Sequence, residues 1–579
     1  MRCLAPRRTE RTHKPLSGAW HRLEDGKRVP LPFGARLARW VTPSLAYVLG
    51  TAALYAPKYA MGTTPPLRTS LTLLAALGLG AWLLAGWRGI SRWRAWMDAA
   101  AWRIVLAATA IVILLSSAFV VFQYQRFIAW VDSPKFAQAL WLVLHGQGLR
   151  PVLGMDLPPQ THVTPTLLLF LPWYALIPSH LGLLLLRNVL LAGSAIPLWF
   201  LARGSLPRRV AALIVLAYLV NFPIWYHLAS GYYELHLFPL LLFLACWCFE
   251  RRWYAGWMVS LALIGGIREE MGFVLLGFGA LAFVCRWPPK YWLGAGLLGF
   301  AWLVCSYELI LGVSRHQYAY AQVYQTRAGL LTSFVTRDNA LYIYQVTLPF
   351  LGLVPFLGWW ALPMWPIFLG NLYAQYPLAK VPFLAYSLPV VAGCFYAVPK
   401  HLRWLAARLA PPSAREWWMA AAAMSMLALG LTQTVEHFWY QKSLHPPLGG
   451  SGLGVLVAEG SRVDADPNAF AAWIDSLREA TRMIPEGCQA SVPRHVIAHV
   501  PHQWGFLDYE YEALDASPPY VLVDANITVL GPESKTRHLD EVLQRRYRVA
   551  YQKNGVLLYE LAGHALAASC PKPLEPGSS

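Results

Sequence analysis

Residues 254–285 read YAGWMVSLALIGGIREEMGFVLLGFGALAFVC, and this stretch decides the class of fold. Two apolar runs, 254–267 and 271–285, flank the adjacent charges of Arg268, Glu269 and Glu270. Each run is shorter than the ~20 residues of a full membrane span. Three neighbouring charges between apolar runs are costly in a bilayer unless they face water or one another. The stretch therefore predicts two short membrane helices joined by a charged turn.

The composition of the whole chain agrees with a membrane protein. The 579 residues are 56% hydrophobic and 13% charged, and the mean hydropathy is +0.40. Soluble domains carry about 25% charged residues, so an ordinary cytosolic enzyme is excluded. The net charge of +18 would suit a nucleic acid or a membrane surface. The 27 Trp residues and the long apolar runs favour the lipid bilayer, and we expect no nucleic-acid partner.

The apolar runs predict a mainly α-helical, polytopic transmembrane bundle with about 11–13 spans. Two regions leave the number of crossings open, because 164–202 and 346–398 each contain pieces that could split or re-enter the membrane. The clear candidates are 41–57, 69–87, 101–122, 210–226, 291–311, 346–370, 381–398 and 417–433, and the shorter pieces are 164–178, 181–202, 237–249, 254–267 and 271–285.

Charge divides the chain into three regions. Residues 1–40 hold ten Lys/Arg and three acids, which predicts a cytoplasmic tail by the positive-inside rule. Residues 41–433 form the predicted transmembrane domain, with outer loops at 123–163 and 312–345 and only ten carboxylates. Residues 434–579 hold twelve Lys/Arg and seventeen acids and are predicted to be extracytoplasmic. A different number of crossings would place this last region inside the cell.

The C-terminal region has the pattern of a small α/β domain. We expect an amphipathic helix over 468–484, and Asn554-Gly555 is typical of a two-residue hairpin turn. Cys488 and Cys570 would form a disulfide in an oxidising compartment, and two free thiols are an equal alternative. Strands are expected at 489–492, 520–523, 547–551 and 556–561.

Candidate functional residues gather on the predicted outer side. Asp132 precedes an amphipathic helix, so it could be an N-cap or a catalytic carboxylate at the membrane surface, and the two roles are compatible. Arg268 could be half of an ion pair or could bind phosphate, while Glu269 and Glu270 could hold a metal ion. The other candidates for binding a substrate or its phosphate are His162, Glu234, His236, Arg315 and Arg327.

The order of these motifs resembles a bacterial multi-span family, domain-of-unknown-function family 2079. The resemblance covers residues 100–560, and no single motif carries it alone. Ala137 departs from the family, where a second Asp is frequent, which puts a two-carboxylate metal site in that loop in doubt. The matching pieces are Asp132, Phe136-x-Gln138-Ala-Leu-Trp141, His145-Gly146, His162-x-x-Pro165, Glu234-Leu235-His236, Arg268-Glu269-Glu270, 490–492, 499–502, 520–524 and 555–559.

That family is similar to the C-type glycosyltransferases, which take sugars from polyprenyl phosphates at the outer face. The resemblance implies that Asp132 activates or orients the acceptor, and that Arg268 stabilises the phosphate. It implies a bacterial inner-membrane protein that binds a polyprenyl-phosphate-linked sugar, with Mg or Mn as the divalent cation suggested by the acids. The alternatives are a transporter or lipid flippase without enzymatic activity, and an envelope assembly protein. The sugar, the acceptor and the oligomeric state are not predicted.

Overall fold

The computed structural model describes part of the chain, and the expected spans at 41–57 and 69–87 lie outside that part. Within the basic tail it describes β1 (Trp20–Arg22), which pairs antiparallel with β2 (Arg28–Pro30). The described residues are 20–22, 28–30, 91–127, 133–146, 162–313, 334–374, 377–382, 384–412, 414–440, 467–485, 488, 490–493, 496–500, 506–508, 518–524 and 543–563.

The chain divides into two compact units, each built from several stretches of sequence. The first unit comprises Met1–Ile113, Leu190–Tyr226 and Leu235–Tyr440. The second unit comprises Leu114–Val189, His227–Glu234 and Gln441–Ser579.

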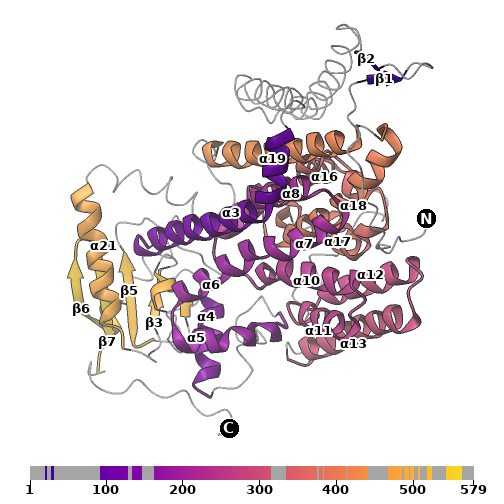
Figure 1. Cartoon of the computed structure of the whole chain (residues 1–579). Helices are drawn as coiled ribbons and strands as arrows, with labels where there is room; N and C mark the ends of the chain where they lie inside the picture. The colour runs from indigo at the N-terminus through magenta and orange to yellow at the C-terminus, as the bar shows by residue number, and fades with distance from the viewer. Residues whose placement is uncertain are drawn as a thin grey trace. The chain divides into compact units, whose positions relative to one another are not determined.

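Helices build the first unit, as the sequence predicts (Figure 1). Three described helices are long and apolar enough to cross a membrane, at Ala95–Gln125, His180–Ser205 and Pro289–Leu309, and a pair bent by 48° would be a fourth. The helices with residues in this unit are α3 (Ser91–Gln125), α6 (His180–Gly193), α7 (Ala195–Ser205), α8 (Arg208–Leu219), α9 (Phe222–Ala229), α10 (Phe238–Glu250), α11 (Tyr254–Gly265), α12 (Met271–Val284), α13 (Pro289–Val313), α16 (Arg337–Thr347), α17 (Trp365–Tyr373), α18 (Leu388–Leu409) and α19 (Arg415–Tyr440).

The expectation of one uninterrupted span at 346–370 is wrong, and the alternative that this run splits is confirmed. The segment forms η5 (Leu348–Phe350), η6 (Val354–Phe356) and η7 (Trp359–Met364) before α17 begins. Proline lacks the backbone N–H that a continuous helix needs and clashes with the preceding turn. The prolines of this run therefore break an apolar stretch into short turns, which continue in η8 (Pro377–Lys380) and η9 (Ala385–Ser387).

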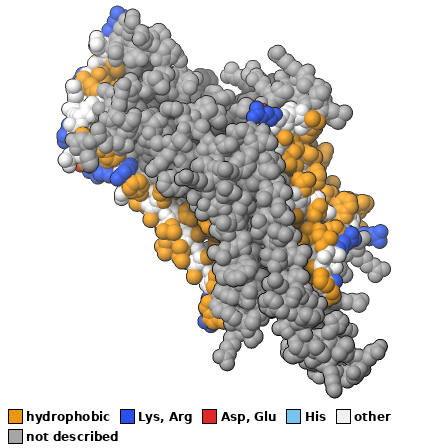
Figure 2. Space-filling view, turned by 90° about the horizontal axis from the view of Figure 1, so that it is seen from above, with side chains coloured by type: hydrophobic (Ala, Val, Ile, Leu, Met, Phe, Trp, Pro, Cys, Tyr) orange, Lys and Arg blue, Asp and Glu red, His pale blue; other side chains and the backbone are white. Residues whose placement is uncertain are grey.

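Close packing joins α12 to α13. A Cβ on Gly272 would lie 2.5 Å from Leu303 Cγ, and a Cβ on Gly299 would lie 2.8 Å from the carbonyl oxygen of Gly272. Small residues let membrane helices approach closely without a polar contact. On the other side α13 exposes Leu297 (66%) and Phe300 (63%), and hydrophobic side chains cover much of the described surface in Figure 2. Such a surface is suited to lipid.

The second unit combines short helices with the predicted α/β domain. A five-stranded sheet has the order β4-β3-β5-β7-β6, with β3 parallel to β4 and β5 and with β7 antiparallel to β5 and β6. The bounds are η3 (Pro165–Phe170), α4 (Pro134–Leu144), α5 (Leu171–Leu176), η4 (Glu234–Leu237, shared with the first unit), α21 (Pro467–Arg482), η10 (Ile497–His499), β3 (Ala490–Val492), β4 (Phe506–Asp508), β5 (Tyr520–Asp524), β6 (Tyr547–Lys553) and β7 (Val556–Leu561).

The predicted features of this domain are confirmed. Helix α21 lies along the sheet (Figure 1), and its Trp473 donates from Nε1 to Asp524 Oδ2 at 2.9 Å. Asn554 and Gly555 have φ values of 46° and 78°, as the hairpin turn requires. Cys488 is buried and disulfide-bonded, so a free thiol there is wrong. Its pairing with Cys570 stays a prediction, because Cys570 lies outside the described residues.

Candidate functional site

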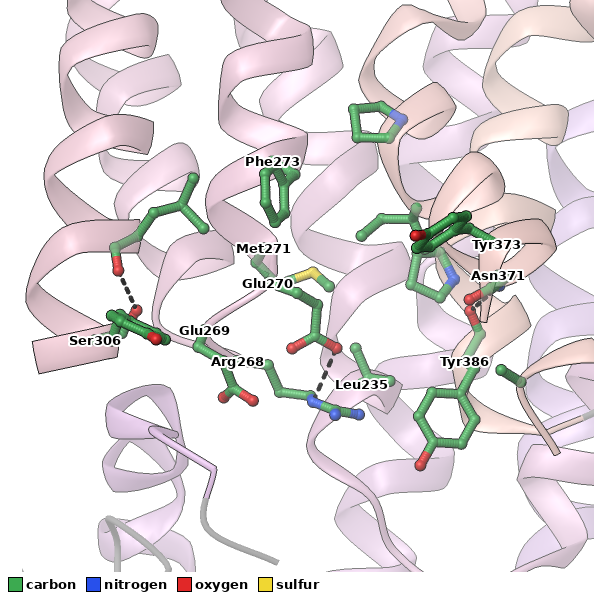
Figure 3. Close-up of a pocket in the computed structure, with 17 residues that line it drawn as sticks. Leu235, Arg268, Glu269, Glu270, Met271, Phe273, Ser306, Asn371, Tyr373 and Tyr386 are labelled. Atoms are coloured by element: carbon green, nitrogen blue, oxygen red, sulfur yellow. Dashed lines mark hydrogen bonds and ion pairs between the residues drawn. The ribbon is translucent and has the colours of Figure 1, made fainter. Parts of the chain in front are cut away.

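A cavity of about 680 Å³ lies within the first unit, beside the start of α12 (Figure 3). Most of its lining side chains are apolar and come from α12, α13, α17 and the proline-broken segment. Its polar and charged groups include the triplet that the sequence singles out. The lining residues are Leu235, Arg268, Glu269, Glu270, Met271, Phe273, Leu303, Ser306, Tyr307, Pro366, Ile367, Gly370, Asn371, Tyr373, Ala379, Tyr386 and Pro389.

The charged triplet forms the turn before α12. Arg268 and Glu269 are only 5% and 7% exposed, so these charges are removed from bulk solvent. The Nε of Arg268 lies 3.0 Å from Glu270 Oε1, and its guanidinium lies 5.5 Å from the centre of the Tyr386 ring. Glu270 occupies the N-cap position of α12, where the helix dipole stabilises a negative charge. The turn therefore presents a buried cation and two carboxylates to an apolar cavity.

Hydrogen bonds hold the backbone on both sides of the cavity. The indole Nε1 of Trp302 on α13 donates to the carbonyl oxygen of Arg268 at 3.1 Å. The Nδ2 of Asn371 on α17 donates to the carbonyl oxygen of Tyr386 at 3.0 Å and to Tyr342 Oη at 2.9 Å. Sequence reasoning missed Asn371 because it directly follows the predicted span 346–370, and it missed Tyr386 because it lies inside the predicted span 381–398. The prolines within these runs were the available signal.

A basic side chain lies next in sequence to a residue of the cavity wall. Lys380 follows the lining residue Ala379 at the end of η8. Partial burial lowers the pKa of Lys380, and the negative charge of Asp338 acts in the opposite direction. The positive charge of Lys380 is thus less favoured here than in open water.

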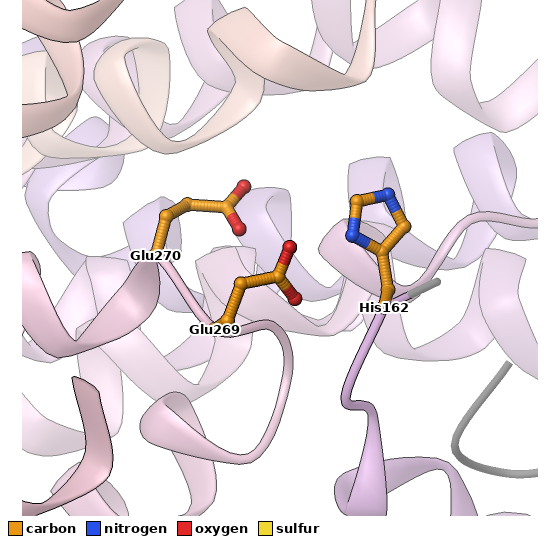
Figure 4. A group of neighbouring side chains, drawn as sticks. All are labelled: His162, Glu269 and Glu270. Carbon is orange, nitrogen blue, oxygen red and sulfur yellow. The ribbon is translucent and has the colours of Figure 1, made fainter. Parts of the chain in front are cut away.

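Glu269 and Glu270 fit one part of a divalent-cation site. One carboxylate oxygen of each lies within 4.8 Å of the other, and both side chains project the same way from consecutive residues (Figure 4). Hard cations such as Mg²⁺ and Mn²⁺ prefer carboxylate oxygens, and Mg²⁺ commonly uses one or two carboxylates with waters and substrate phosphates. The donor set therefore suits such an ion, although Arg268 competes for Glu270. His162, drawn in the same figure, belongs to the second unit.

Buried polar contacts also organise the second unit. Ser133 Oγ lies 2.6 Å from His180 Nε2 and accepts the backbone N–H of Tyr232 at 2.5 Å. Arg187, which the sequence analysis overlooked, donates to the carbonyl oxygens of Leu228, Ser230 and Gly231. Burial raises the pKa of Tyr232, the carboxylate of Glu234 adds to the rise, and Arg187 opposes it.

The structure locates some of the predicted residues and not others. Arg268, Glu269 and Glu270 share the cavity, whereas His236 is buried beside the lining residue Leu235. His162 and Glu234 belong to the second unit, and Glu234 is buried there. Asp132, Arg315 and Arg327 lie outside the described residues.

The N-cap role of Asp132 stays a prediction, because Asp132 lies outside the described residues. Helix α4 begins at Pro134, and the preceding Ser133 has helical backbone angles and makes no side-chain capping hydrogen bond. The catalytic interpretation of Asp132 is a separate hypothesis and stays a prediction.

The fold and the cavity define a class: a mainly α-helical membrane protein with a charged, apolar-walled cavity and a small C-terminal α/β domain. A profile of the family described as "Predicted membrane protein (DUF2079)" matches residues 131–558. The chain therefore belongs to this family, which confirms the resemblance seen in the motifs.

The other comparisons find similar proteins only among solved structures. A search of curated protein sequences found no significant match. Among solved structures, the chain is similar to ArnT from Cupriavidus metallidurans bound to undecaprenyl phosphate, with 14% identity, a TM-score of 0.46, and coverage of 82% of this chain and 100% of that one. The apo form of the same protein gives 12% identity, a TM-score of 0.45, and coverage of 78% and 98%.

Proposed function

We propose that this protein is a membrane glycosyltransferase that moves a sugar from a polyprenyl-phosphate donor to an acceptor at the outer face of the bacterial inner membrane. One observation carries the proposal: a buried guanidinium, Arg268, stands in a cavity whose walls are otherwise mostly apolar. A lipid-linked phosphate has the matching chemistry, because it joins an anionic group to a long apolar chain. A soluble sugar nucleotide would gain little from these walls.

The cavity chemistry assigns a role to each charge of the triplet. Arg268 would leave Glu270 partly or wholly to donate to the phosphate oxygens, since guanidinium binds phosphate with two parallel hydrogen bonds. Its positive charge would stabilise the phosphate as the sugar departs. Glu269 and Glu270 would hold a divalent cation, Mg²⁺ or Mn²⁺, which when bound would neutralise further phosphate charge.

The remaining predicted residues complete the reaction. An acceptor hydroxyl attacks the anomeric carbon, the bond between that carbon and the phosphate oxygen breaks, and Asp132 accepts the hydroxyl proton. Arg315 and Arg327 would bind the anionic part of the donor. His162, Glu234 and His236 would contact the sugar or the acceptor. The N-terminal tail is cytoplasmic and the C-terminal domain extracytoplasmic in this proposal.

The test is sugar transfer by the full-length protein in proteoliposomes, with radiolabelled polyprenyl-phosphate sugars and envelope glycans as acceptors. We expect Asp132→Asn to abolish turnover. Arg268→Gln should weaken donor binding about tenfold to hundredfold, the usual effect of losing one or two charge-assisted hydrogen bonds. Glu308→Gln is the matched control, because Glu308 is an exposed carboxylate on α13 that does not line the cavity.

The same variants separate the enzyme from its alternatives. Unchanged turnover in Asp132→Asn would remove that residue from the mechanism. Movement of labelled lipid across the vesicle membrane without any sugar transfer would instead identify a transporter or flippase. Equal losses in Arg268→Gln and Glu308→Gln would contradict a specific role for the cavity.

A further inference from the structure

Two turns of the first unit end their helices with the same uncommon device. Arg252 follows α10 and Arg286 follows α12, with φ values of 58° and 55°. In both turns the next residue is a tryptophan whose backbone N–H donates to the carbonyl oxygen five residues earlier in the helix. Trp253 N–H donates to Cys248 O at 2.9 Å, and Trp287 N–H donates to Ala282 O at 3.0 Å. This is the Schellman type of helix end.

Glycine is the usual residue at this left-handed position, because a Cβ disfavours it. Here arginine occupies the position twice, in two separate turns. Non-glycine residues in this conformation cost free energy, and such residues cluster at functional sites. The common property of the two side chains is a permanent positive charge.

The two turns form one basic surface. Arg251, Arg252, Arg286 and Lys290 are all exposed, and within the described residues none of them has a carboxylate partner. The nearby acid Glu250 is engaged elsewhere, because its Oε1 lies 2.7 Å from Lys400 Nζ. The four positive charges are therefore available to an anionic ligand.

Aromatic side chains fix this surface in place. The Phe249 and Trp287 rings stack at 4.0 Å between centroids with an interplanar angle of 5°. Tyr291 Oη donates to the carbonyl oxygen of Arg252 at 2.8 Å, which ties one turn to the other. The guanidinium of Arg252 lies 5.5 Å from the centre of the Trp287 ring. The charges are thus carried on a rigid support.

A surface pocket of about 500 Å³ opens beside these charges. Phe283, which lines the pocket, is strongly exposed (63%), and so is Trp253 (56%) in the other turn, as expected for groups that enter the bilayer interface. The pocket thus combines one cation with an aromatic and apolar wall. It is lined by Phe283, Val284, Arg286, Trp287, Pro289 and Trp292.

We propose that this surface binds the headgroup of an anionic phospholipid in the cytoplasmic leaflet, because the positive-inside rule places loops rich in Lys and Arg, as both turns are, on the cytoplasmic side. The phosphate would lie between Arg252 and Arg286, and the acyl chains would extend along Phe283. Basic pockets beside transmembrane helices are suited to such headgroups. This proposal does not depend on glycosyl transfer.

The test uses full-length protein in detergent micelles, with bound lipid counted by native mass spectrometry. Dioleoyl phosphatidylglycerol, dioleoyl phosphatidylcholine and inorganic phosphate are the probes. The double variant Arg252→Asn/Arg286→Asn removes both charges, and asparagine tolerates the left-handed conformation of these two positions. Arg403→Gln, an exposed arginine on α18, is the control for a general loss of charge.

We expect the unmodified protein to prefer phosphatidylglycerol over phosphatidylcholine by about tenfold or more. The double variant should lose this preference, and Arg403→Gln should keep it. Retention of the preference in the double variant would overturn the proposal. So would its equal loss in Arg403→Gln, or displacement of the lipid by millimolar inorganic phosphate. A thermal midpoint at or above that of the unmodified protein confirms that the double variant is folded.

Discussion

Replacing Arg187 with methionine should destabilise the second unit strongly. Arg187 is 1% exposed, and its guanidinium donates to the carbonyl oxygens of Leu228 and Gly231 at 2.9 Å each and to that of Ser230. Methionine fills a similar volume but offers no donor. Each buried acceptor left without its donor costs about 1–3 kcal/mol, so three of them should cost at least about 3 kcal/mol.

This loss is large enough to measure on the full-length protein in detergent. Thermal unfolding followed by tryptophan fluorescence should show a midpoint lower by roughly 5–15 °C. Backbone amides of residues 228–234 should exchange hydrogen faster, because the segment loses its anchor. Arg203→Met is the control, since Arg203 is exposed near the end of the same candidate span. An Arg187→Met protein with the midpoint and exchange of the Arg203→Met protein would refute the reasoning.

Two other substitutions test the packing and the electrostatics. Gly272→Ala should lower the thermal midpoint, because its Cβ would lie 2.5 Å from Leu303 Cγ and overpacking costs about 1–3 kcal/mol. Gly296→Ala is the control and should leave the midpoint unchanged, because a Cβ there has open space around it. Similar midpoints for the two variants would contradict the close packing of α12 on α13. The pKa of Glu479 is held below its usual 4.5 mainly by the hydrogen bond from Tyr551. The ionised Glu479 carboxylate therefore stabilises the fold above the unfolded-state pKa, and this stabilisation is lost as the pH falls through the lower folded-state pKa. Glu479→Gln should accordingly lower the thermal midpoint at neutral pH and leave it unchanged in strong acid. A constant difference across that pH range would exclude this linkage.

Local sequence signals predicted most of the C-terminal domain. Helix α21, strands β3, β5, β6 and β7, and the Asn554-Gly555 turn follow from periodicity and turn chemistry. Strand β4 (Phe506–Asp508) was missed, because three residues are too few for an alternating pattern. Its place in the sheet depends on pairing with β3, which lies fourteen residues earlier in the chain and is not a local signal.

The candidate site was only half accessible to sequence reasoning. Arg268, Glu269 and Glu270 stood out because adjacent charges between apolar runs need a special environment. The opposite wall, with Asn371 and Tyr386, depends on how the chain folds back after its prolines. Arg187 was overlooked because a single cation within a leucine-rich run changes the average hydropathy little.

The two buried arginines, Arg187 and Arg268, differ in the groups that they contact. Arg187 is buried and donates from Nε to Asn188 Oδ1 and from its two terminal nitrogens to three backbone carbonyl groups, so it fixes a segment and has little donor capacity left for a ligand. Arg268 is similarly buried, but its Nε lies 3.0 Å from Glu270 Oε1, a carboxylate oxygen, and it lines a cavity large enough for a substrate group. An anionic ligand can compete with a carboxylate for a guanidinium, but it cannot replace three backbone carbonyls without unfolding their loop. This contrast supports the proposal that Arg268 binds the phosphate of the donor, whereas Arg187 maintains the fold.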